Sequence, residues 1–511
     1  MSLLGIDVGT TGCKAAAFSL DGRVLASAYR EYATRHPREG WSELDSRTVL
    51  GRVEETIAEV AAACRADPVA ALCVSSMGEA MTPVSADRRI LGPSILMTDA
   101  RGSDLLAPLI ERFGRPALYE INPNIAGPLY SLPKLLWIRR HQAELYAQAH
   151  KFLLWSDLVA FMLGAEPMTS FSLANRTLLF DIRRQDWSEA LLAASGIARE
   201  KLAPCVPSGT VAGTVSEAAA ARLGLPRGVA IVVGGHDQCC NSLGAGIARA
   251  GLAVCGIGTF ECITPTYDHI PDSSTMLAAG LGVEHHVLPG LYVSFIHNQS
   301  GSLVRWFRDT FAAADKRLLG AGEDIYDALA REMPAEPTRL LVLPHFEPSG
   351  APEMVSHSAG AIVGLKMDTT RGEILKAVME SATFWFAGAL DRLKRMKIDT
   401  SEFIATGGGA RSDPWLQIKA DVFGVPLVRP AITETSTLGA AILAGMATGS
   451  LAGAADGISR FVRRQRVFEP DRRRHAVYRE RILAFQKLYP ALTGVFSALF
   501  EPAAEAAGDS A

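Results

Sequence analysis

Residues 5–14, GIDVGTTGCK, place an acid inside an apolar β-strand and follow it at once with two threonines between glycines. A carboxylate in such a strand is costly unless its charge is compensated. Glycines let the backbone turn tightly, and the N–H groups and hydroxyls of such a turn can bind phosphate. Asp7, at the strand end, could then hold Mg²⁺ through water. An ordinary hairpin with a solvated Asp7 is the alternative interpretation.

The first hundred residues show an alternation of strands and helices. SLLGIDVG, CKAAAFSL and RVLASAYREY predict three antiparallel strands, with a turn at Asp21-Gly22 before the third. A helix is expected from about Asp45 to Ala66, then the buried strand ALCVSSM and a hairpin around Ala86-Asp87-Arg88. This pattern is typical of an α/β protein.

A second acid follows an apolar strand in VVGGHDQCCNSLGAG, residues 232–246. At the mouth of a sheet, the carboxylate of Asp237 could accept a proton from a hydroxyl that attacks phosphorus. Asp is also a favoured helix N-cap, so a purely structural role is equally compatible with the pattern. The adjacent Cys239-Cys240 pair is expected to be buried packing and not a catalytic thiol.

The pattern then begins again, which indicates a weak internal repeat. GIGTF, residues 256–260, is a further Gly-Thr turn between strands, and a later strand runs into Gly407-Gly408-Gly409. Three glycines let the backbone approach a flat or charged ligand closely. Thr370 and Glu373 form a capping box that should start a helix. A last helix, containing Tyr478, Ile482, Phe485 and Leu488, should end before Pro490, and the tail EPAAEAAGDSA should be disordered.

Length and charge restrict the class of protein. A chain of 511 residues is too long to fold around one hydrophobic core, so two domains are expected, with a third possible. The 51 basic and 54 acidic residues form no block of one sign, which favours a small-molecule partner over nucleic acid or a membrane. No apolar run reaches about 18 residues and no signal-like segment opens the chain, so a cytoplasmic protein with reduced cysteines is expected.

Together these segments resemble the FGGY carbohydrate kinases of the actin-like ATPase superfamily, over about residues 3–455. GIDVGTTGCKAAAFSLDGRVL is similar to that family's first phosphate hairpin, GGHDQ to its catalytic-aspartate strand and CGIGTF to its second hairpin. TGGGARSDPWLQIKADVFGVPL with ETSTLGAAILA is similar to its adenosine motif. MTDARG and TSFSLANRTLLFDI are similar to stretches of its sugar-binding domain.

The resemblance implies an α/β chain of two actin-like, ribonuclease H-like domains with a cleft between them. Residues 1–247 would bind the sugar and supply the base, residues 248–455 would bind the nucleotide, and 456–511 would be helices and a tail. The implied activity is Mg²⁺- and ATP-dependent phosphorylation of a small sugar or polyol, with a ketopentose such as xylulose expected first.

Several alternatives stay open beside that activity. The substrate could be glycerol, erythritol or gluconate, and the chain could be an inactive, sugar-responsive binding protein. An actin-like or chaperone-like ATPase with a macromolecular partner would not need MTDARG or TSFSLANRT. Asp237 favours an enzyme, because a non-enzyme needs no base at that point. The oligomeric state is open, with a homodimer as one candidate.

The resemblance also implies the roles of single residues. Asp237 would be the general base and Asp7 the Mg²⁺ holder. The expected contacts to ATP are Thr10, Thr11, Lys14, Gly258, Thr259, Gly407, Gly408, Gly409, Ala410 and Ser412. The expected contacts to the acceptor are Met77, Gly78, Glu79, Asp99 and His236.

This chain departs from the family pattern at the sugar site. Glycerol kinases carry an Arg-Glu pair after the corresponding strand and xylulose kinases a Met-His pair, whereas this chain has Met77-Gly78-Glu79. If Glu79 matches the glycerol-kinase glutamate, it accepts hydrogen bonds from substrate hydroxyls; a solvated loop acid is the alternative. His236 and Phe260 are also unusual at their positions.

Overall fold

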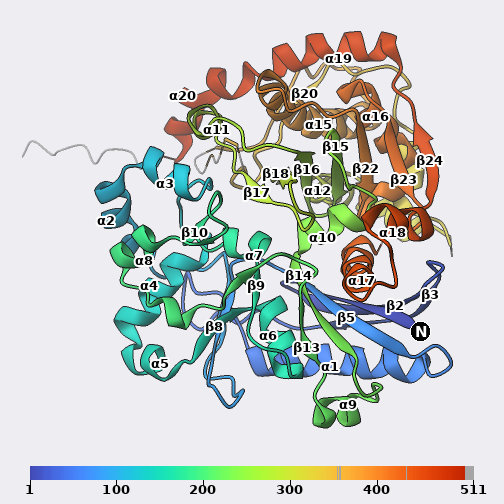
Figure 1. Cartoon of the computed structure of the whole chain (residues 1–511). Helices are drawn as coiled ribbons and strands as arrows, with labels where there is room; N and C mark the ends of the chain where they lie inside the picture. Colours follow the sequence, from blue (N-terminus) through green and yellow to red (C-terminus); the bar gives the residue numbers. More distant parts are fainter. Residues whose placement is uncertain (321, 351, 354, 356–357, 433, 501–511) are drawn as a thin grey trace, which may run out of the picture.

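Two mixed sheets organise the chain, one in the lower and one in the upper half of the view in Figure 1. The computed structural model describes residues 1–320, 322–350, 352–353, 355, 358–432 and 434–500. Helices cover both sheets, and those of residues 103–148 and 189–195 form an extension at the side of the first half (Figure 1). The chain is therefore an α/β protein with two halves, as the sequence predicts.

The first sheet has the strand order β13-β14-β5-β1-β2-β3. The three N-terminal strands are antiparallel, which confirms the predicted meander, while β5 runs parallel to β1 and β14 parallel to β5. The bounds are β1 Ser2–Val8, β2 Gly12–Ser19, β3 Val24–Glu31, β5 Val69–Ser76, β13 Val211–Thr214 and β14 Ala230–His236.

The second sheet repeats this arrangement. From β15 the antiparallel β16 lies on one side and the parallel β22 and β23 on the other, with an antiparallel strand at each end. The predicted internal repeat is thus present in the topology. The bounds are β15 Leu252–Ile257, β16 Phe260–Tyr267, β17 Glu284–His285, β18 Tyr292–Val293, β19 Ile296–Gln299, β22 Glu402–Thr406, β23 Leu427–Pro430 and β24 Arg464–Phe468.

Short strand pairs connect the surrounding loops. Val84 bridges to Ile90, and the Ser85 N–H donates to the Arg89 carbonyl at 2.9 Å, which confirms the predicted hairpin near residue 87. The pairs are β4 Glu43–Leu44 with β7 Ser94–Ile95, β6 Met81–Val84 with β8 Lys151–Leu154, β9 Thr169–Ser170 with β12 Cys205–Val206, β10 Phe180–Asp181 with β11 Asp186–Trp187, and β20 Leu341–Leu343 with β21 Ala361–Val363.

The helices of the first half begin with α1, Ser46–Ala63, which lies against β2 and β3. Asp45 caps it by accepting the Thr48 N–H, and Val49, Val53 and Ile57 form its buried face, which explains why this predicted helix forms. The others are α2 Ser103–Phe113, α3 Arg115–Ile121, α4 Ser131–His141, α5 Ala143–Gln148, α6 Trp155–Leu163, α7 Phe171–Asn175, α8 Glu189–Ser195 and α9 Glu217–Leu223, with a 3₁₀ turn at Arg199–Lys201.

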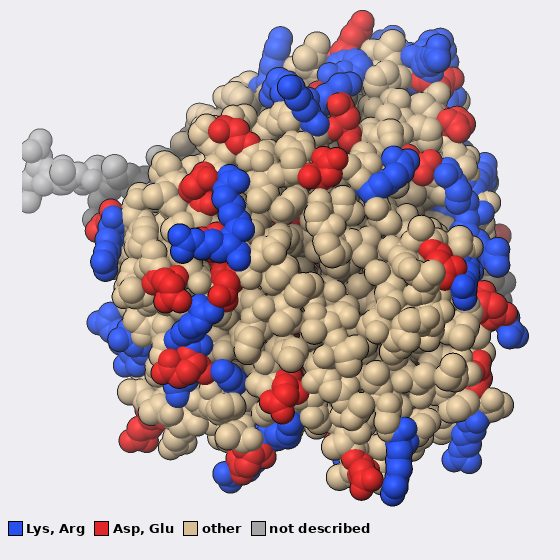
Figure 2. Space-filling model, in the orientation of Figure 1, with Lys and Arg blue, Asp and Glu red and all other residues tan. Residues whose placement is uncertain are grey.

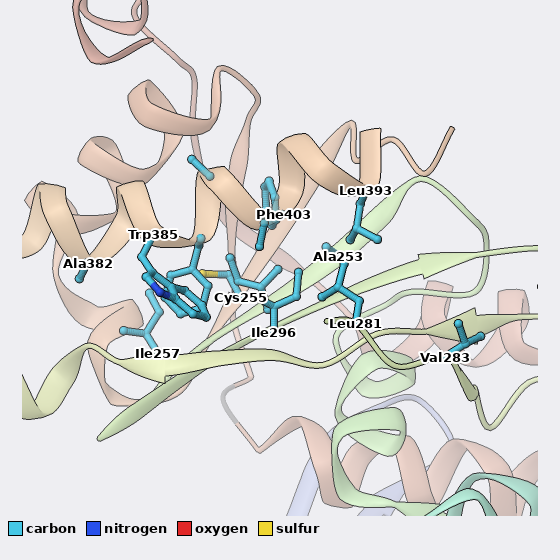
Figure 3. Packing of buried hydrophobic residues seen from close by; sticks show 14 of the residues in the cluster. Ala253, Cys255, Ile257, Leu281, Val283, Ile296, Ala382, Trp385, Leu393 and Phe403 are labelled. Carbon is cyan, nitrogen blue, oxygen red and sulfur yellow. The ribbon is translucent and has the colours of Figure 1, made fainter. Parts of the chain in front are cut away.

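The second half is built around α15, Arg371–Arg395, which starts at the predicted Thr370–Glu373 capping box. Its apolar side chains lie over those of the second sheet, and Figure 3 shows Trp385 above Ile257. The helix α10, Asp237–Gly244, follows β14 and belongs to the first half. The other helices of the second half are α11 Ser273–Ala278, α12 Gly301–Phe311, α13 Ala313–Leu318, α14 Ile325–Ala330, α16 Asp413–Phe423, α17 Thr435–Ala447, α18 Ala454–Phe461, α19 Arg472–Phe485 and α20 Leu488–Phe500, with a 3₁₀ turn at Gly408–Arg411.

The C-terminal region differs from the sequence expectation. The predicted single helix is wrong: α19 ends at Phe485, and Leu488 begins α20 with Pro490 in its first turn, where proline's missing N–H costs nothing. The region also adds the unpredicted strand β24 to the second sheet. The expected disordered tail, residues 501–511, lies outside the described residues.

One helical run among the described residues, Arg472–Phe500, passes the length and composition test for crossing a bilayer. A single run of this kind is weak evidence for a span. In this chain α19 packs against α15 and α16, and it buries Tyr478 and Ile482. That packing is typical of a helix that belongs to a folded core.

The two halves meet where α10 and α17 pack together, between the sheets in Figure 1. A Cβ added at Gly244 would lie 1.8 Å from the Thr435 carbonyl oxygen, and one at Gly439 would lie 1.9 Å from that of Cys240. Gly5 of β1 would meet the Thr437 carbonyl oxygen at 1.8 Å. Thus α17, which follows β23 of the second sheet, lies with its backbone directly on the first sheet.

We predict that Gly439→Ala lowers the free energy of unfolding by at least about 2 kcal/mol, because the new methyl group overpacks a backbone contact that cannot shift alone. Urea denaturation measures the change. Gly51→Ala in α1 is the matched control, since nothing lies within 4 Å of its new Cβ, and it should be neutral or stabilise by up to about 1 kcal/mol. Equal midpoints for the two variants would contradict the prediction.

Candidate active site

Three parallel strands of the first sheet end at one edge and bring acids together there. Asp7 lies near the end of β1, Glu79 follows the end of β5, and Asp237 is the first residue after β14. The carboxyl ends of parallel strands are the usual place for ligand binding in α/β folds. The predicted acids therefore share one neighbourhood, with the exception of Asp99.

Asp7 is a half-buried acid with a partly satisfied carboxylate. Its Oδ1 accepts a hydrogen bond from the Ser75 hydroxyl at 2.8 Å. Burial raises the pKa of Asp7 to about 6, with Glu434 adding to the rise and Lys14 opposing it. Lys14 stands opposite Asp7 in the β1–β2 pair, and its Nζ lies 2.5 Å from Glu434 Oε2, so this ion pair joins the first half to the start of α17.

Asp237 occupies the first turn of α10, and His236 is the N-cap residue, so Asp237 is not the helix cap. Its carboxylate accepts the N–H of Gln238 at 2.6 Å and its side chain is 26% exposed. Burial raises the pKa of Asp237 to about 8, and the nearby carboxylate of Asp7 adds to the rise. An acid with these properties is oriented, accessible and a good proton acceptor near neutral pH.

His236 lies beside this acid, with Nε2 at 3.3 Å from Asp237 Oδ1. Burial, together with the charge of Arg176, lowers the pKa of His236 well below its usual value, so the ring is neutral. Its Nδ1 is buried and has no hydrogen-bond partner among the described residues. The ring packs edge-on to Phe295, with the centroids 5.0 Å apart.

Glu79 is not a solvated loop acid, since it is 5% exposed and its backbone has φ of +59°. Its carboxylate accepts from Arg176, at 2.6 Å from Nε, and its carbonyl accepts from Ser131. Gly78 makes room for that arginine, because a Cβ there would lie 2.9 Å from Arg176 Cγ. Sequence reasoning missed Arg176 although it lies in TSFSLANRT, since no local pattern tells which distant residue pairs with Glu79.

Three predicted residues lie apart from this group. Asp99 is 1% exposed and its oxygens accept from the Ser42 N–H and from Arg101, so no acceptor is left for a sugar hydroxyl. The prediction that it binds sugar is corrected to a structural role. The Met77 side chain packs in the core of the first half, and Ala410 is buried with its carbonyl bound to Arg429.

The first predicted phosphate hairpin has an exposed tip. The Gly9 N–H donates to the Gly12 carbonyl at 2.9 Å, which leaves Thr10 and Thr11 exposed between β1 and β2. The Tyr32 hydroxyl donates to the Gly9 carbonyl at 2.6 Å and holds the turn from the side. The hydroxyls at the tip are thus presented on a rigid loop, as phosphate binding requires.

The second hairpin has the same form between β15 and β16. The Gly258 N–H donates to the Phe260 carbonyl at 3.1 Å, and the first N–H groups of α12 donate to the carbonyls of Gly258 and Thr259. Arg305 reaches the Thr259 hydroxyl at 3.2 Å. The unusual Phe260 is 48% exposed, and its carbonyl still accepts the Gly258 N–H, so the hairpin forms with phenylalanine at this position.

The third element is the glycine run between β22 and α16. Gly407 has φ of +81°, and its neighbour Gly408 is exposed with nothing within 4 Å of an added Cβ. Gly409 is pressed against the side chain of Ile257, just before the second hairpin. Ser412 caps α16 by accepting the Trp415 N–H. Open backbone thus lies beside the second hairpin, with room for a flat group.

A fully buried ion pair lies beneath the second hairpin, and the sequence analysis does not predict it. Lys419 Nζ on α16 lies 2.6 Å and 2.8 Å from the two carboxylate oxygens of Glu261 on β16, and both side chains are 0% exposed. The Ser300 hydroxyl, at the start of α12, donates to the same carboxylate. This pair connects the glycine-run helix to the hairpin strand.

The residues present fit Mg²⁺ that arrives with a nucleotide. No cluster of three or more His, Cys, Asp or Glu able to hold a metal occurs among the described residues. Mg²⁺ usually needs only one or two protein carboxylates, because phosphates and water supply the remaining ligands. Asp7 Oδ2 has no hydrogen-bond partner within the described part of the chain, and Asp237 lies close to it.

The cysteines show no catalytic arrangement. All eight are free thiols, in agreement with the expectation of reduced cysteines. Burial raises the pKa of Cys239 and Cys240 well above the usual value, which disfavours the thiolate. Both cysteines lie on α10, which packs closely against α17, and small buried side chains suit that close contact.

Comparison with known proteins identifies relatives along almost the whole chain. The sequence model of the FGGY family of carbohydrate kinases, N-terminal domain, matches residues 2–244, and that of the C-terminal domain matches residues 255–448. The xylulose kinase of Bacillus subtilis (strain 168) is 26% identical over 491 residues, covering 95% of this chain and 96% of that one. The autoinducer-2 kinase of Escherichia coli (strain K12) is 30% identical over 519 residues, covering 95% and 94%.

Among solved structures, xylulose kinase from Rhodospirillum rubrum superposes with a TM-score of 0.87 at 28% identity, covering 97% of this chain and 100% of that one. Gluconate kinase from Lactobacillus acidophilus has a TM-score of 0.86 at 23% identity, covering 98% and 99%, and therefore shows a shared fold. These similarities agree with the two-domain architecture expected from the motifs.

We predict that Lys419→Met lowers the free energy of unfolding by about 3–5 kcal/mol, because Glu261 would remain as a buried acid without its partner. Urea denaturation followed by far-ultraviolet circular dichroism measures the loss. The control is Arg473→Met, which removes an exposed ion pair with Glu336 and should leave the midpoint unchanged. A Lys419 variant as stable as this control would show that the buried pair is not needed.

Proposed function

The chain belongs to the FGGY family of carbohydrate kinases, and from that premise we propose that this ATP-dependent kinase phosphorylates a hydroxyl of a small sugar or polyol, with a ketopentose such as xylulose as first candidate. The observation that carries the proposal is that Asp7 and Asp237 lie at the ends of parallel strands at one edge of the first sheet. Phosphoryl transfer needs a base, a metal holder and a phosphate cradle in one place.

In this proposal Asp237 accepts the proton of the attacking hydroxyl. The Gln238 N–H holds its carboxylate in place, and its raised pKa makes it a stronger base than an exposed aspartate. The neutral ring of His236 beside it adds no positive charge that would weaken the base. Asp237 can thus act on the acceptor without contacting the nucleotide.

The nucleotide contacts in this proposal come from both halves. Thr10 and Thr11 would donate hydrogen bonds to phosphate oxygens from the first half and Thr259 from the second, where Gly258 lets the backbone turn close to the phosphate. Lys14 would add positive charge, and Gly407 to Gly409 would accommodate adenosine, with Ser412 at the following helix. Bound Mg²⁺ would neutralise phosphate charge, and Asp7 would hold it through water.

The family leaves the acceptor open, so a substrate screen is the primary experiment. Coupled ADP release should be measured with ketopentoses, glycerol, erythritol, gluconate and the acceptor of the autoinducer-2 kinases, because relatives 30% identical carry that name. We expect the highest kcat/KM with a ketopentose. ADP release with none of them would favour the sugar-responsive binding protein instead.

The surroundings of the chain are also part of the proposal. We propose that the protein acts in the cytoplasm and that its partners are ATP and a small-molecule acceptor. Figure 2 supports this choice, since lysines and arginines are mixed with acids around the rim of the face shown, and neither sign forms a continuous area. Such a surface offers no basic track of the kind that nucleic acids or anionic membranes need.

Asp237→Asn should reduce the sugar-dependent turnover number by about 100-fold or more, because the amide keeps the shape of the carboxylate but accepts no proton. ATP affinity, measured by calorimetry, should not change. The exposed Asp268→Asn serves as the control and should turn over at the wild-type rate. Retention of a tenth of the activity in Asp237→Asn would exclude this residue as the base.

Asp7→Asn should raise the Mg²⁺ concentration needed for half-maximal rate by about 10- to 100-fold, since it removes the charge that holds the water shell of the metal. Added Mg²⁺ should therefore restore part of the activity. Titration of Mg²⁺ at saturating ATP measures the shift, with Asp268→Asn again as control. An unchanged Mg²⁺ requirement would remove Asp7 as the metal residue.

A further inference from the structure

Arg176 is clasped between two acids from different halves of the chain. It follows α7, and its Nε and Nη2 donate to Glu79, while Nη1 donates to Glu284 on β17. The guanidinium carbon also lies over the rings of Tyr130 and Phe295, at 5.0 Å and 5.7 Å from their centroids. In Figure 1 α7 and β17 lie side by side, so this arginine bridges the first half to the second.

The three charged side chains are almost inaccessible, at 11% exposure for Arg176, 5% for Glu79 and 2% for Glu284. Glu284 Oε2 nevertheless has no hydrogen-bond partner among the described residues, and neither has His236 Nδ1. A buried polar atom without a partner is unfavourable and needs an explanation. A bound molecule that supplies hydrogen-bonding groups would provide one.

A pocket opens beside these atoms, between the two halves. Its lining includes Tyr130 and Arg176 from the first half and Glu284, Phe295 and His297 from the second. The imidazole of His236 contacts the same Phe295 ring. Phe295 therefore separates the pocket from His236, and His236 in turn lies beside Asp237.

The net charge of Glu79, Arg176 and Glu284 together is zero or negative. One guanidinium faces two carboxylates, of which Glu284 has its pKa raised to about 7 by burial, against the opposing effect of Arg176. His297 is neutral, because burial and Arg176 lower its pKa to about 4. No positive charge is left uncompensated for a bound anion, and a buried anion without a partner is strongly disfavoured.

We propose that the Glu79–Arg176–Glu284 clasp selects an uncharged polyhydroxy acceptor and excludes sugar acids. This inference rests on the proposed kinase activity and narrows its substrate class, which the family leaves open between ketoses, polyols and acids. Hydroxyl groups of the acceptor donate to the free oxygen of Glu284 and to Glu79. A carboxylate in the same place would face these two acids and Asp237.

The test compares acceptors of equal chain length that differ in charge. Coupled ADP release is measured with xylulose and xylitol against xylonate, and with glucitol against gluconate. We expect kcat/KM for the preferred neutral compound to exceed that of its acid at least about 100-fold, because like charges repel each other strongly in a buried site. If a sugar acid is used as well as its neutral counterpart, the inference is wrong and the kinase proposal is unaffected. If none of these acceptors causes ADP release, both the inference and the kinase proposal are wrong.

Two matched variants show whether the clasp causes the preference. Glu284→Gln and Glu79→Gln each remove one negative charge and keep the shape, so each should reduce the neutral-to-acid ratio at least about tenfold while the KM for ATP stays unchanged. Glu120→Gln, at an exposed ion pair with Arg183, is the control and should keep the wild-type ratio. If both clasp variants also keep it, the clasp does not determine the selection.

Discussion

The contact between α10 and α17 brings backbone directly against backbone. Gly244 and Gly439 permit it, since any side chain at either position would overlap a carbonyl oxygen of the other helix. Because α10 follows the first sheet and α17 follows the second, this contact sets how the carboxyl ends of the two sheets face each other. The acids of one half and the glycine turns of the other depend on it for their relative positions.

Burial of charge is the second constraint on the candidate site. Asp7 and Asp237 lie at the same edge of the first sheet, and the carboxylate of Asp7 raises the pKa of Asp237 in addition to the effect of burial, while Glu434 adds to the raised pKa of Asp7. Such a pair is unfavourable without a cation, which fits a site completed by Mg²⁺ and a nucleotide. Elsewhere the charges are compensated internally, as with Lys419 and Glu261 beneath the second hairpin. The contrast between compensated and uncompensated acids distinguishes structural positions from candidate functional ones.

Local patterns predicted much of the fold and part of the site. The β1–β3 meander, both Gly-Thr hairpins and the Thr370 capping box are each specified by residues a few positions apart, and all of them form. The prediction for Asp99 was wrong because its carboxylate accepts hydrogen bonds from Arg101 of the same motif and from the Ser42 N–H, and the approach of Ser42, 57 positions away, depends on tertiary packing. The division of the C-terminal helix at residue 486 was also missed, since Pro490 is tolerated in a first turn.

The sequence by itself determined which elements form and which polar residues end the strands, because hydrophobic periodicity and turn chemistry act over short distances. It also placed the chain in its family, since the motifs occur in a fixed order. Only the tertiary structure decided that Arg176 fills the space over Gly78 and that Glu284 approaches it from the other half. Those contacts join residues about 100 positions apart, and a pairing at that distance depends on how whole sheets and helices pack.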